Sequence, residues 1–374
     1  MAELAALYRI DQFIDTFALG HYARVLEVLD LRSGQNVALK VMRPEHLSAN
    51  GDLRWEYRAF ANEAHLLTRL AASPQVVNLL DCGYLSSTSE APAGGEIVSF
   101  KHDSSGFVQA MPDYAEQGWR PYLALAYLPR YFNLLYLMRP DKASTRWRLP
   151  SEEGLALALQ FAETLRLAHR MGIVYMDHKL EHVYWDGTQL QIIDFNSSRQ
   201  LEGDIGAHSH YFRMDIHNLC VGVLYPLFTG LSPYKMTLRP QPGTREEAEN
   251  RYQDVTELDF GVEPTLSADL KTLLQSGAAQ EIAQIDEFIM ALHRVGVRHG
   301  WDFSDYTASP ANREARARMR AGLNRLRQGH THLREARDLL REAVIEEGIS
   351  EDLEDELRRL VKLINEMLSH RVIP

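Results

Sequence analysis

The sequence has few cysteines and no long hydrophobic run. Its two cysteines, Cys82 and Cys220, lie far apart and outside any C-x-x-C spacing, so neither a disulfide framework nor a zinc site is predicted. The longest apolar stretch, about residues 219–228, is about half as long as a membrane-spanning helix, and the first residues contain no apolar signal segment. We therefore expect a cytoplasmic protein without a membrane partner.

The sequence also lacks an excess of positive charge. Its formal net charge is -11 at pH 7, whereas non-specific nucleic-acid binding draws its affinity from Lys and Arg that neutralise phosphates. No nucleic-acid partner is therefore expected. Hydrophobic residues at 45% and charged residues at 24% are typical of a folded globular chain. A length of 374 residues favours two or three folding units rather than one core.

The first third of the sequence favours strands. Apolar segments separated by turn residues predict strands at residues 8–13, 24–30, 36–42, 76–84 and 120–129. Phe60, Ala64, Leu67 and Leu70 recur at three- and four-residue spacing and predict a helix over residues 52–71. Residues 85–120 are rich in Ser, Gly and Pro, and we interpret them as a surface insertion.

Helices dominate the sequence after residue 129. Residues 151–171 form an amphipathic pattern that begins at Ser151 and Glu152, residues 189–195 resemble a short strand, and residues 214 to about 300 favour helices. The change from strands to helices near residues 127–130 predicts an α+β protein of two lobes. The β-rich lobe spans residues 1–128, the helical lobe spans residues 129–308, and residues 309–374 form an extension.

The extension is composed almost entirely of helix-forming residues interrupted at Gly348, which predicts two long helices. Residues 311–341 contain nine Arg and three acidic residues, whereas residues 342–374 contain four basic and nine acidic residues. Antiparallel packing of the two helices as a hairpin lets these charges compensate. Binding of a protein partner, or self-association through residues 311–374, is the alternative.

A lysine and a glutamate stand out in the β-rich part. Lys40 lies on a strand of apolar residues, so its ammonium needs a carboxylate or a phosphate, and Glu63 on the following helix is a suitable carboxylate. A surface ion pair is the alternative interpretation. Before this strand, the hairpin with Gly20 and Val25 offers backbone N–H groups that suit phosphates, although a plain β-turn explains the same residues.

Charged residues gather at two later positions. Asp177, Lys179 and His182 lie in one short segment, and Asp194 follows after the hairpin-like residues 183–193, which brings Asp177 and Asp194 close together. Phosphoryl transfer needs an acceptor for the nucleophile's proton, a cation near the γ-phosphate and a carboxylate for a metal ion. These residues supply that set.

The segment Met176-Asp177-His178-Lys179-Leu180-Glu181-His182 resembles the H-R-D-L-K-P-E-N loop of the protein kinase superfamily, and Asp194-Phe195-Asn196 resembles its D-F-G. The resemblance covers about residues 8–300 and implies a two-lobed kinase-like fold. It implies that Lys40 holds the α- and β-phosphates and pairs with Glu63, that Asp177 is the catalytic base, that Lys179 contacts the γ-phosphate and that Asp194 binds Mg²⁺. The ATP-binding residues that it implies are Gly20, Val25, Ala38, Lys40, Glu63, Leu125, Ala126, Leu128 and Tyr184.

The sequence departs from the kinase pattern in several places. His182 replaces the asparagine that holds a second Mg²⁺, and imidazole suits Mn²⁺ better than Mg²⁺, so one-metal or Mn²⁺ chemistry is expected. Asp194 and Asp215 are only 21 residues apart, and no A-P-E is present. That shortness leaves the acceptor open between a protein and a small-molecule hydroxyl.

These features together predict an ATP-dependent phosphotransferase, a divergent Ser/Thr protein kinase that uses ATP with Mg²⁺ or Mn²⁺. Asp177 and Lys179 are the expected catalytic residues, and Asp194 and His182 the expected metal ligands. Two alternatives remain open: a pseudokinase that binds nucleotide as a scaffold, and a small-molecule kinase of the same fold. ATP turnover separates the first alternative from the other two functions.

Overall fold

The computed structural model describes most of the chain in two units, residues 1–301 and 302–374. The described residues are 2–13, 22–47, 53–90, 92, 94–138, 147–203, 208–233, 251–301, 310–345 and 348–369. Each unit is described here by itself.

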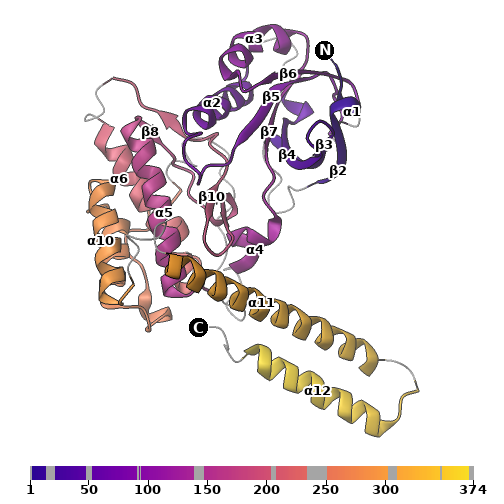
Figure 1. The fold of residues 1–374 in the computed structure, drawn as a ribbon, viewed down its shortest axis with the longest axis vertical. Helices are drawn as coiled ribbons and strands as arrows, with labels where there is room; N and C mark the ends of the chain where they lie inside the picture. Colours follow the sequence, from indigo (N-terminus) through magenta and orange to yellow (C-terminus); the bar gives the residue numbers. More distant parts are fainter. Residues whose placement is uncertain are drawn as a thin grey trace. The chain divides into compact units, whose positions relative to one another are not determined.

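The first unit begins with an antiparallel sheet of seven described strands (Figure 1). In sheet order the strands are β1 (Ala2–Glu3), β6 (Glu96–Lys101), β5 (Leu79–Leu85), β7 (Arg120–Ala126), β4 (Gln35–Met42), β3 (Ala23–Asp30) and β2 (Tyr8–Phe13). The short helix α1 (Leu4–Leu7) joins β1 to β2. The predicted strands near residues 8, 24, 36, 79 and 120 are confirmed.

Alternation along the strands explains why one face of this sheet is covered. Leu26 and Val28 of β3, and Val37, Leu39 and Val41 of β4, are all buried in one cluster. Residues two apart on a strand point to the same face, so these side chains form a continuous apolar layer. The intervening side chains point to the other face of the sheet, and Lys40 is one of them.

Two helices accompany the sheet. Helix α2 (Trp55–Arg69) packs against β5 and β7 and buries the predicted apolar positions, and α3 (Ser104–Glu116) packs against α2 and strands β5–β7. Helix α3 and strand β6 both lie within residues 85–120. The interpretation of that segment as a surface insertion is therefore wrong for these elements, because Phe107 and Met111 are buried and β6 hydrogen-bonds to two other strands.

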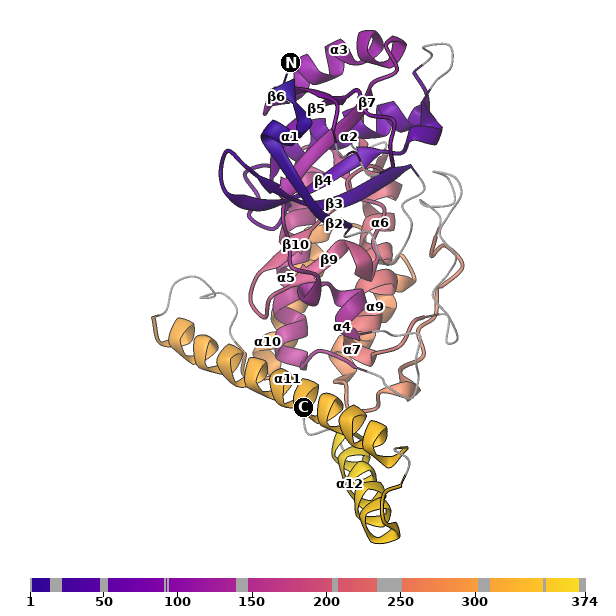
Figure 2. The same ribbon diagram turned by 90° about the vertical axis from the view of Figure 1, so that its right-hand side faces the viewer.

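The remainder of the first unit is mostly helical (Figures 1 and 2). Its helices are α4 (Leu134–Met138), α5 (Ser151–Arg170), α6 (Ser209–Asn218), the π-helix η6 (Leu219–Leu224), α7 (Tyr225–Thr229), α9 (Ala268–Ala278) and α10 (Ile285–Arg298). Single helical turns lie at Pro44–His46, Arg130–Phe132, Leu180–His182 and Phe260–Val262. Two small antiparallel pairs join β9 (Val183–Trp185) to β10 (Leu190–Ile192), and β8 (Ile173–Val174) to β11 (Arg199–Gln200). The molecule is thus a mixed α+β protein, as predicted.

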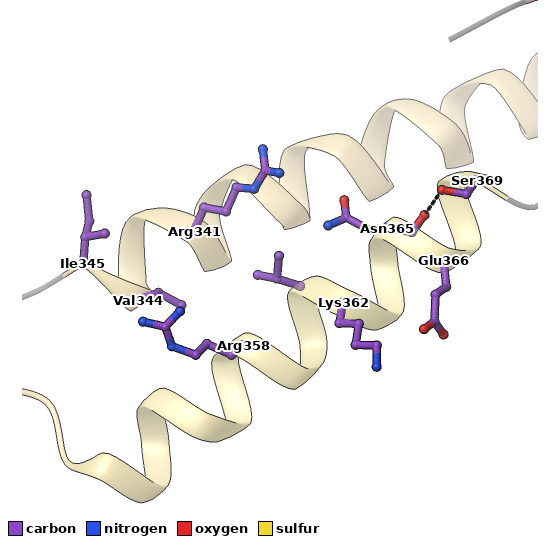
Figure 3. Close-up of a pocket in the computed structure, with 9 residues that line it drawn as sticks. Arg341, Val344, Ile345, Arg358, Lys362, Asn365, Glu366 and Ser369 are labelled. Carbon is purple, nitrogen blue, oxygen red and sulfur yellow. Dashed lines mark hydrogen bonds between the residues drawn. The ribbon is translucent and has the colours of Figure 1, made fainter. Parts of the chain in front are cut away.

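The second unit consists of α11 (Pro310–Val344) and α12 (Glu351–Ser369), which pack against each other. Both helices predicted from the sequence are confirmed. A groove of about 840 Å³ lies between the C-terminal end of α11 and the middle and C-terminal part of α12, and is lined by Val344, Ile345 and Val361 together with basic side chains, among them Arg341 and Arg358 (Figure 3). No helix within the described ranges is both long and apolar enough to cross a membrane.

Candidate active site

Lys40 contacts two carboxylates from distant parts of the sequence. Its Nζ lies 2.7 Å from Glu63 Oε2 and 2.7 Å from Asp194 Oδ1. Lys40 and Glu63 are 6% and 0% exposed, so the alternative of a surface ion pair is wrong. Burial opposes the charge on Lys40, but the carboxylates of Asp194 and Glu63 outweigh it and hold its pKa well above the ordinary value.

The backbone around these residues explains their positions. Lys40 lies in the middle of β4, in register with Val25 of β3 and Leu123 of β7. Asp194 follows β10 with a φ of 63°, a left-handed conformation that few residues other than glycine adopt. Asn62, next to Glu63 on α2, donates from Nδ2 to the carbonyl of Ser198 at 2.8 Å. The loop that carries Asp194 is thereby tied to α2.

Asp177 is the centre of a second charged cluster. Arg251 Nη2 donates to Asp177 Oδ1 at 3.1 Å, and Lys179 Nζ lies 3.3 Å from Oδ2. Lys179 is also 3.7 Å from Glu181. Burial favours the neutral form of Asp177, but the charges of Lys179, His182 and Arg251 prevail and lower its pKa. Asp177 is therefore an ionised, cation-paired carboxylate.

His182 links the two clusters. Its Nε2 lies 3.1 Å from Asp194 Oδ2, and its Nδ1 lies 3.2 Å from the Asp177 carbonyl and 3.6 Å from Asp177 Oδ2. One ligand atom from each of Asp177, His182 and Asp194 can be chosen so that all three lie within 4.8 Å of one another. Two carboxylates and an imidazole at this spacing fit a single divalent cation of the first transition row.

Asp215, on helix α6, supports the segment that carries Asp177. Its carboxylate accepts the backbone N–H groups of Tyr175 at 2.8 Å and Met176 at 2.7 Å, and lies 3.0 Å from His169 Nε2. Burial favours the neutral form of Asp215, but the hydrogen bonds from His169 and from the Met176 backbone outweigh burial and lower its pKa. Met176 has a φ of 68°, so Asp215 holds a strained backbone directly before Asp177.

The other predicted site residues lie on the same strands and loops. Ala38 of β4 pairs with the buried Leu125 of β7, and Ala126 ends that strand. Leu128 follows it, half-buried. Tyr184 lies on β9 and forms a bridge with Asn133. Val25 adjoins Lys40 on β3, while Gly20 lies outside the described residues.

Two residues of this site were not predicted. Arg251 contacts Asp177 across 74 residues of sequence, and the centre of the Tyr22 ring lies 5.5 Å from Lys40 Nζ. Neither residue belongs to a recognisable motif, since Arg251 follows a segment rich in charged residues and Tyr22 is one aromatic residue in a turn. Only the folded chain brings them to the charged clusters.

Comparisons with known proteins do not assign this chain to a family. The chain matches no protein-family profile, and a comparison with curated proteins finds no relative. The function is therefore inferred from the residues and their geometry.

A buried histidine next to Asp177 gives the protein a specific pH dependence of stability. His178 is fully buried, stacks on Phe161 with ring centres 5.3 Å apart, and burial lowers its pKa to about 4. The unfolded chain protonates this histidine near pH 6.5. We expect its contribution to stability to be complete above pH 6.5 and to be lost progressively as the pH falls toward 4.

Denaturant unfolding at several pH values measures this effect. In His178→Leu the decline between pH 6.5 and 4 should become shallower, while the variant of the exposed His332, His332→Leu, should keep the wild-type slope. Identical slopes for wild type and His178→Leu would contradict the assignment. The carboxylates with lowered pKa values, such as Asp215, lose their contribution only at lower pH.

Proposed function

We propose that this chain is an ATP-dependent phosphotransferase with a divergent, two-lobed kinase-like fold. The observation that carries the proposal is the contact of Lys40 with both Glu63 and Asp194, each at 2.7 Å, beside Asp177 and Lys179. A buried lysine held between two carboxylates is ready to exchange one of them for phosphate oxygens. Lys40 and Glu63 come from the sheet and α2, while Asp177 and Asp194 come from the segments next to β8–β10, which supports a site between two lobes.

Each residue has a role in the proposed reaction. Lys40 and Lys179 hold phosphate oxygens of ATP, and Glu63 keeps Lys40 in place. Asp177 accepts the proton of the acceptor hydroxyl while the acceptor oxygen bonds to the γ-phosphorus and the bond from that phosphorus to the bridging oxygen breaks. The products are ADP and the phosphorylated acceptor. ATP, Mg²⁺ or Mn²⁺, and a protein or small-molecule hydroxyl are the proposed ligands.

Asp194 and His182 are the proposed metal ligands, with Asp177 in reach. The metal ion, when bound, neutralises charge on the phosphates. The donor set fits this role, since the selected atoms of all three residues lie within 4.8 Å of one another. The imidazole of His182 replaces an oxygen donor, and nitrogen donors favour Mn²⁺ over Mg²⁺.

We expect Mn²⁺ to stabilise the ADP-bound protein more than Mg²⁺ does at equal concentration. In His182→Asn an amide oxygen replaces the imidazole, so the apparent affinity for Mn²⁺ should fall by about tenfold and the preference for Mn²⁺ should disappear. Thermal unfolding with ADP and each metal measures both effects without requiring activity. His208→Asn, a change outside the cluster, serves as control; an unchanged Mn²⁺ preference in His182→Asn would contradict the assignment.

The proposed function is tested by following the γ-phosphate of ATP. The full chain is incubated with radiolabelled ATP and Mn²⁺ or Mg²⁺, and ADP, free phosphate, autophosphorylation and transfer to added acceptors are measured. Lys40→Met should abolish the signal. Absence of ATP binding and of all phosphoryl transfer in the wild-type protein would overturn the proposal.

A nucleotide-binding scaffold, or pseudokinase, is the second candidate. One observation favours it: both carboxylate oxygens of Asp177 already face cations, Arg251 on one side and Lys179 on the other. Such a carboxylate has little tendency to take up a proton. ATP-dependent thermal stabilisation without any ADP formation would support the scaffold. A small-molecule kinase of the same fold is supported by the short link between Asp194 and Asp215.

A further inference from the structure

Arg251 contacts Asp177, and it has no role in the proposed reaction. Arg251 Nη2 lies 3.1 Å from Asp177 Oδ1, the oxygen not paired with Lys179. Its side chain is only 7% exposed. An acceptor hydroxyl that gives its proton to Oδ1 competes with this guanidinium for the lone pairs of that oxygen. Arg251 is therefore placed to contact an acceptor that binds at Asp177.

The backbone of Arg251 is held firmly. The carbonyl of Tyr252 lies 3.0 Å from His217 Nε2, and the Tyr252 ring packs so closely on the π-helix η6 that a Cβ on Gly222 would approach it to 2.5 Å. Tyr252 also belongs to a buried apolar cluster with Val221 and Val255. These contacts hold the chain directly after Arg251 in place.

The charges on this side of Asp177 balance. Lys179 and Arg251 face Asp177 and Glu181, and Arg251 is among the cations that lower the pKa of Glu181 against its burial. When a hydroxyl displaces Arg251 from Asp177, the guanidinium loses a carboxylate contact in a buried place, which is costly without a replacement. A neutral acceptor offers none. A cationic acceptor would compete with Arg251 for both carboxylates.

We propose that Arg251 selects acceptors that carry an anionic group, a phosphate or a carboxylate, close to the hydroxyl that is phosphorylated. This inference rests on the proposed function and names the substrate class of the same site. A guanidinium binds either anion through two parallel hydrogen bonds. The anion draws Arg251 away from Asp177 Oδ1, and the freed oxygen accepts the hydroxyl proton as the new O–P bond forms and ADP departs.

Inorganic phosphate is the probe for the anion subsite. Its dissociation constant is measured by calorimetry on the full chain loaded with ADP and Mn²⁺. We expect Arg251→Gln to weaken phosphate binding by about tenfold or more, Arg251→Lys to lose less, and Arg43→Gln, whose arginine pairs with Glu45 and Glu90 elsewhere, to match the wild type. Thermal unfolding confirms that each variant is folded. Equal phosphate binding in Arg251→Gln and wild type overturns the proposal.

Matched acceptors test the selection itself. Glycerol is compared with glycerol 3-phosphate and with glycerate, and kcat/KM for phosphoryl transfer from ATP is measured for each. The wild-type protein should prefer the anionic acceptors, and Arg251→Gln should lose that preference through KM. Faster transfer to glycerol and water in Arg251→Gln, with no loss for the anionic acceptors, would show that Arg251 merely blocks Asp177, and overturns the proposal.

The two arms separate this inference from the proposed function. If phosphate binding depends on Arg251 but the protein never consumes ATP, the anion subsite is supported and the phosphotransferase function is contradicted. If the protein consumes ATP but phosphate binding does not depend on Arg251, the proposed function is supported and the anion subsite is contradicted.

Discussion

Replacing Asp177 with asparagine is expected to lower the rate of ATP-dependent phosphoryl transfer by about 1,000-fold. An amide of the same shape cannot accept the hydroxyl proton, and it also loses the charge that pairs with Arg251 and Lys179. ATP affinity should change little, because Lys40, Glu63 and Asp194 keep their mutual contacts. The loss should therefore appear in kcat rather than in the KM for ATP.

The measurement compares kcat and the KM for ATP in Asp177→Asn and wild type, with either metal present. Asp286→Asn provides a matched control, because Asp286 is a half-exposed carboxylate on α10 whose described partner is Arg166 at 3.6 Å. The control should retain wild-type kinetics. Equal activity in Asp177→Asn and wild type would remove Asp177 from the role of base.

The sheet was largely predictable because its strands are rich in apolar residues and are separated by turn residues. Residues 24–30 and 36–42 are enriched in apolar residues, and on β4 the apolar Val37, Leu39 and Val41 recur at every second position. Residues 85–120 were not predictable, because Ser, Gly and Pro are turn-formers that gave no sign of β6. That strand pairs with β5, which precedes it along the chain, and with β1, which is distant in the sequence. Tertiary pairing overrode local composition.

The charged centre was predictable to the extent that its residues lie in short segments. Asp177, Lys179 and His182 share one loop, and a tight hairpin brings Asp194 beside them, so spacing alone indicated a cluster. The direct contact of His182 with Asp194 refines that expectation. Arg251 carried no local signal, because its contact with Asp177 depends on how the segment after α7 packs against η6.

Asp215 has the largest expected effect on stability. Its carboxylate is completely buried and accepts hydrogen bonds from the backbone of Tyr175 and Met176 and from His169. Asp215→Ala leaves these donors without an acceptor in a buried site, and also releases the left-handed Met176 backbone. We expect the free energy of unfolding to fall by about 3–5 kcal/mol, which denaturant unfolding measures.

Asp215→Asn distinguishes hydrogen bonding from packing in this effect. An amide keeps the shape of the side chain, but its nitrogen cannot accept the Met176 N–H that Oδ1 receives or the Tyr175 N–H that Oδ2 receives, so one of the two backbone donors is unsatisfied in either orientation. Its stability should therefore lie between those of wild type and Asp215→Ala. The surface change Asp286→Ala should stay within about 0.5 kcal/mol of wild type. An unfolding midpoint for Asp215→Ala equal to that of Asp286→Ala would mean that the Asp177 loop holds its conformation without Asp215.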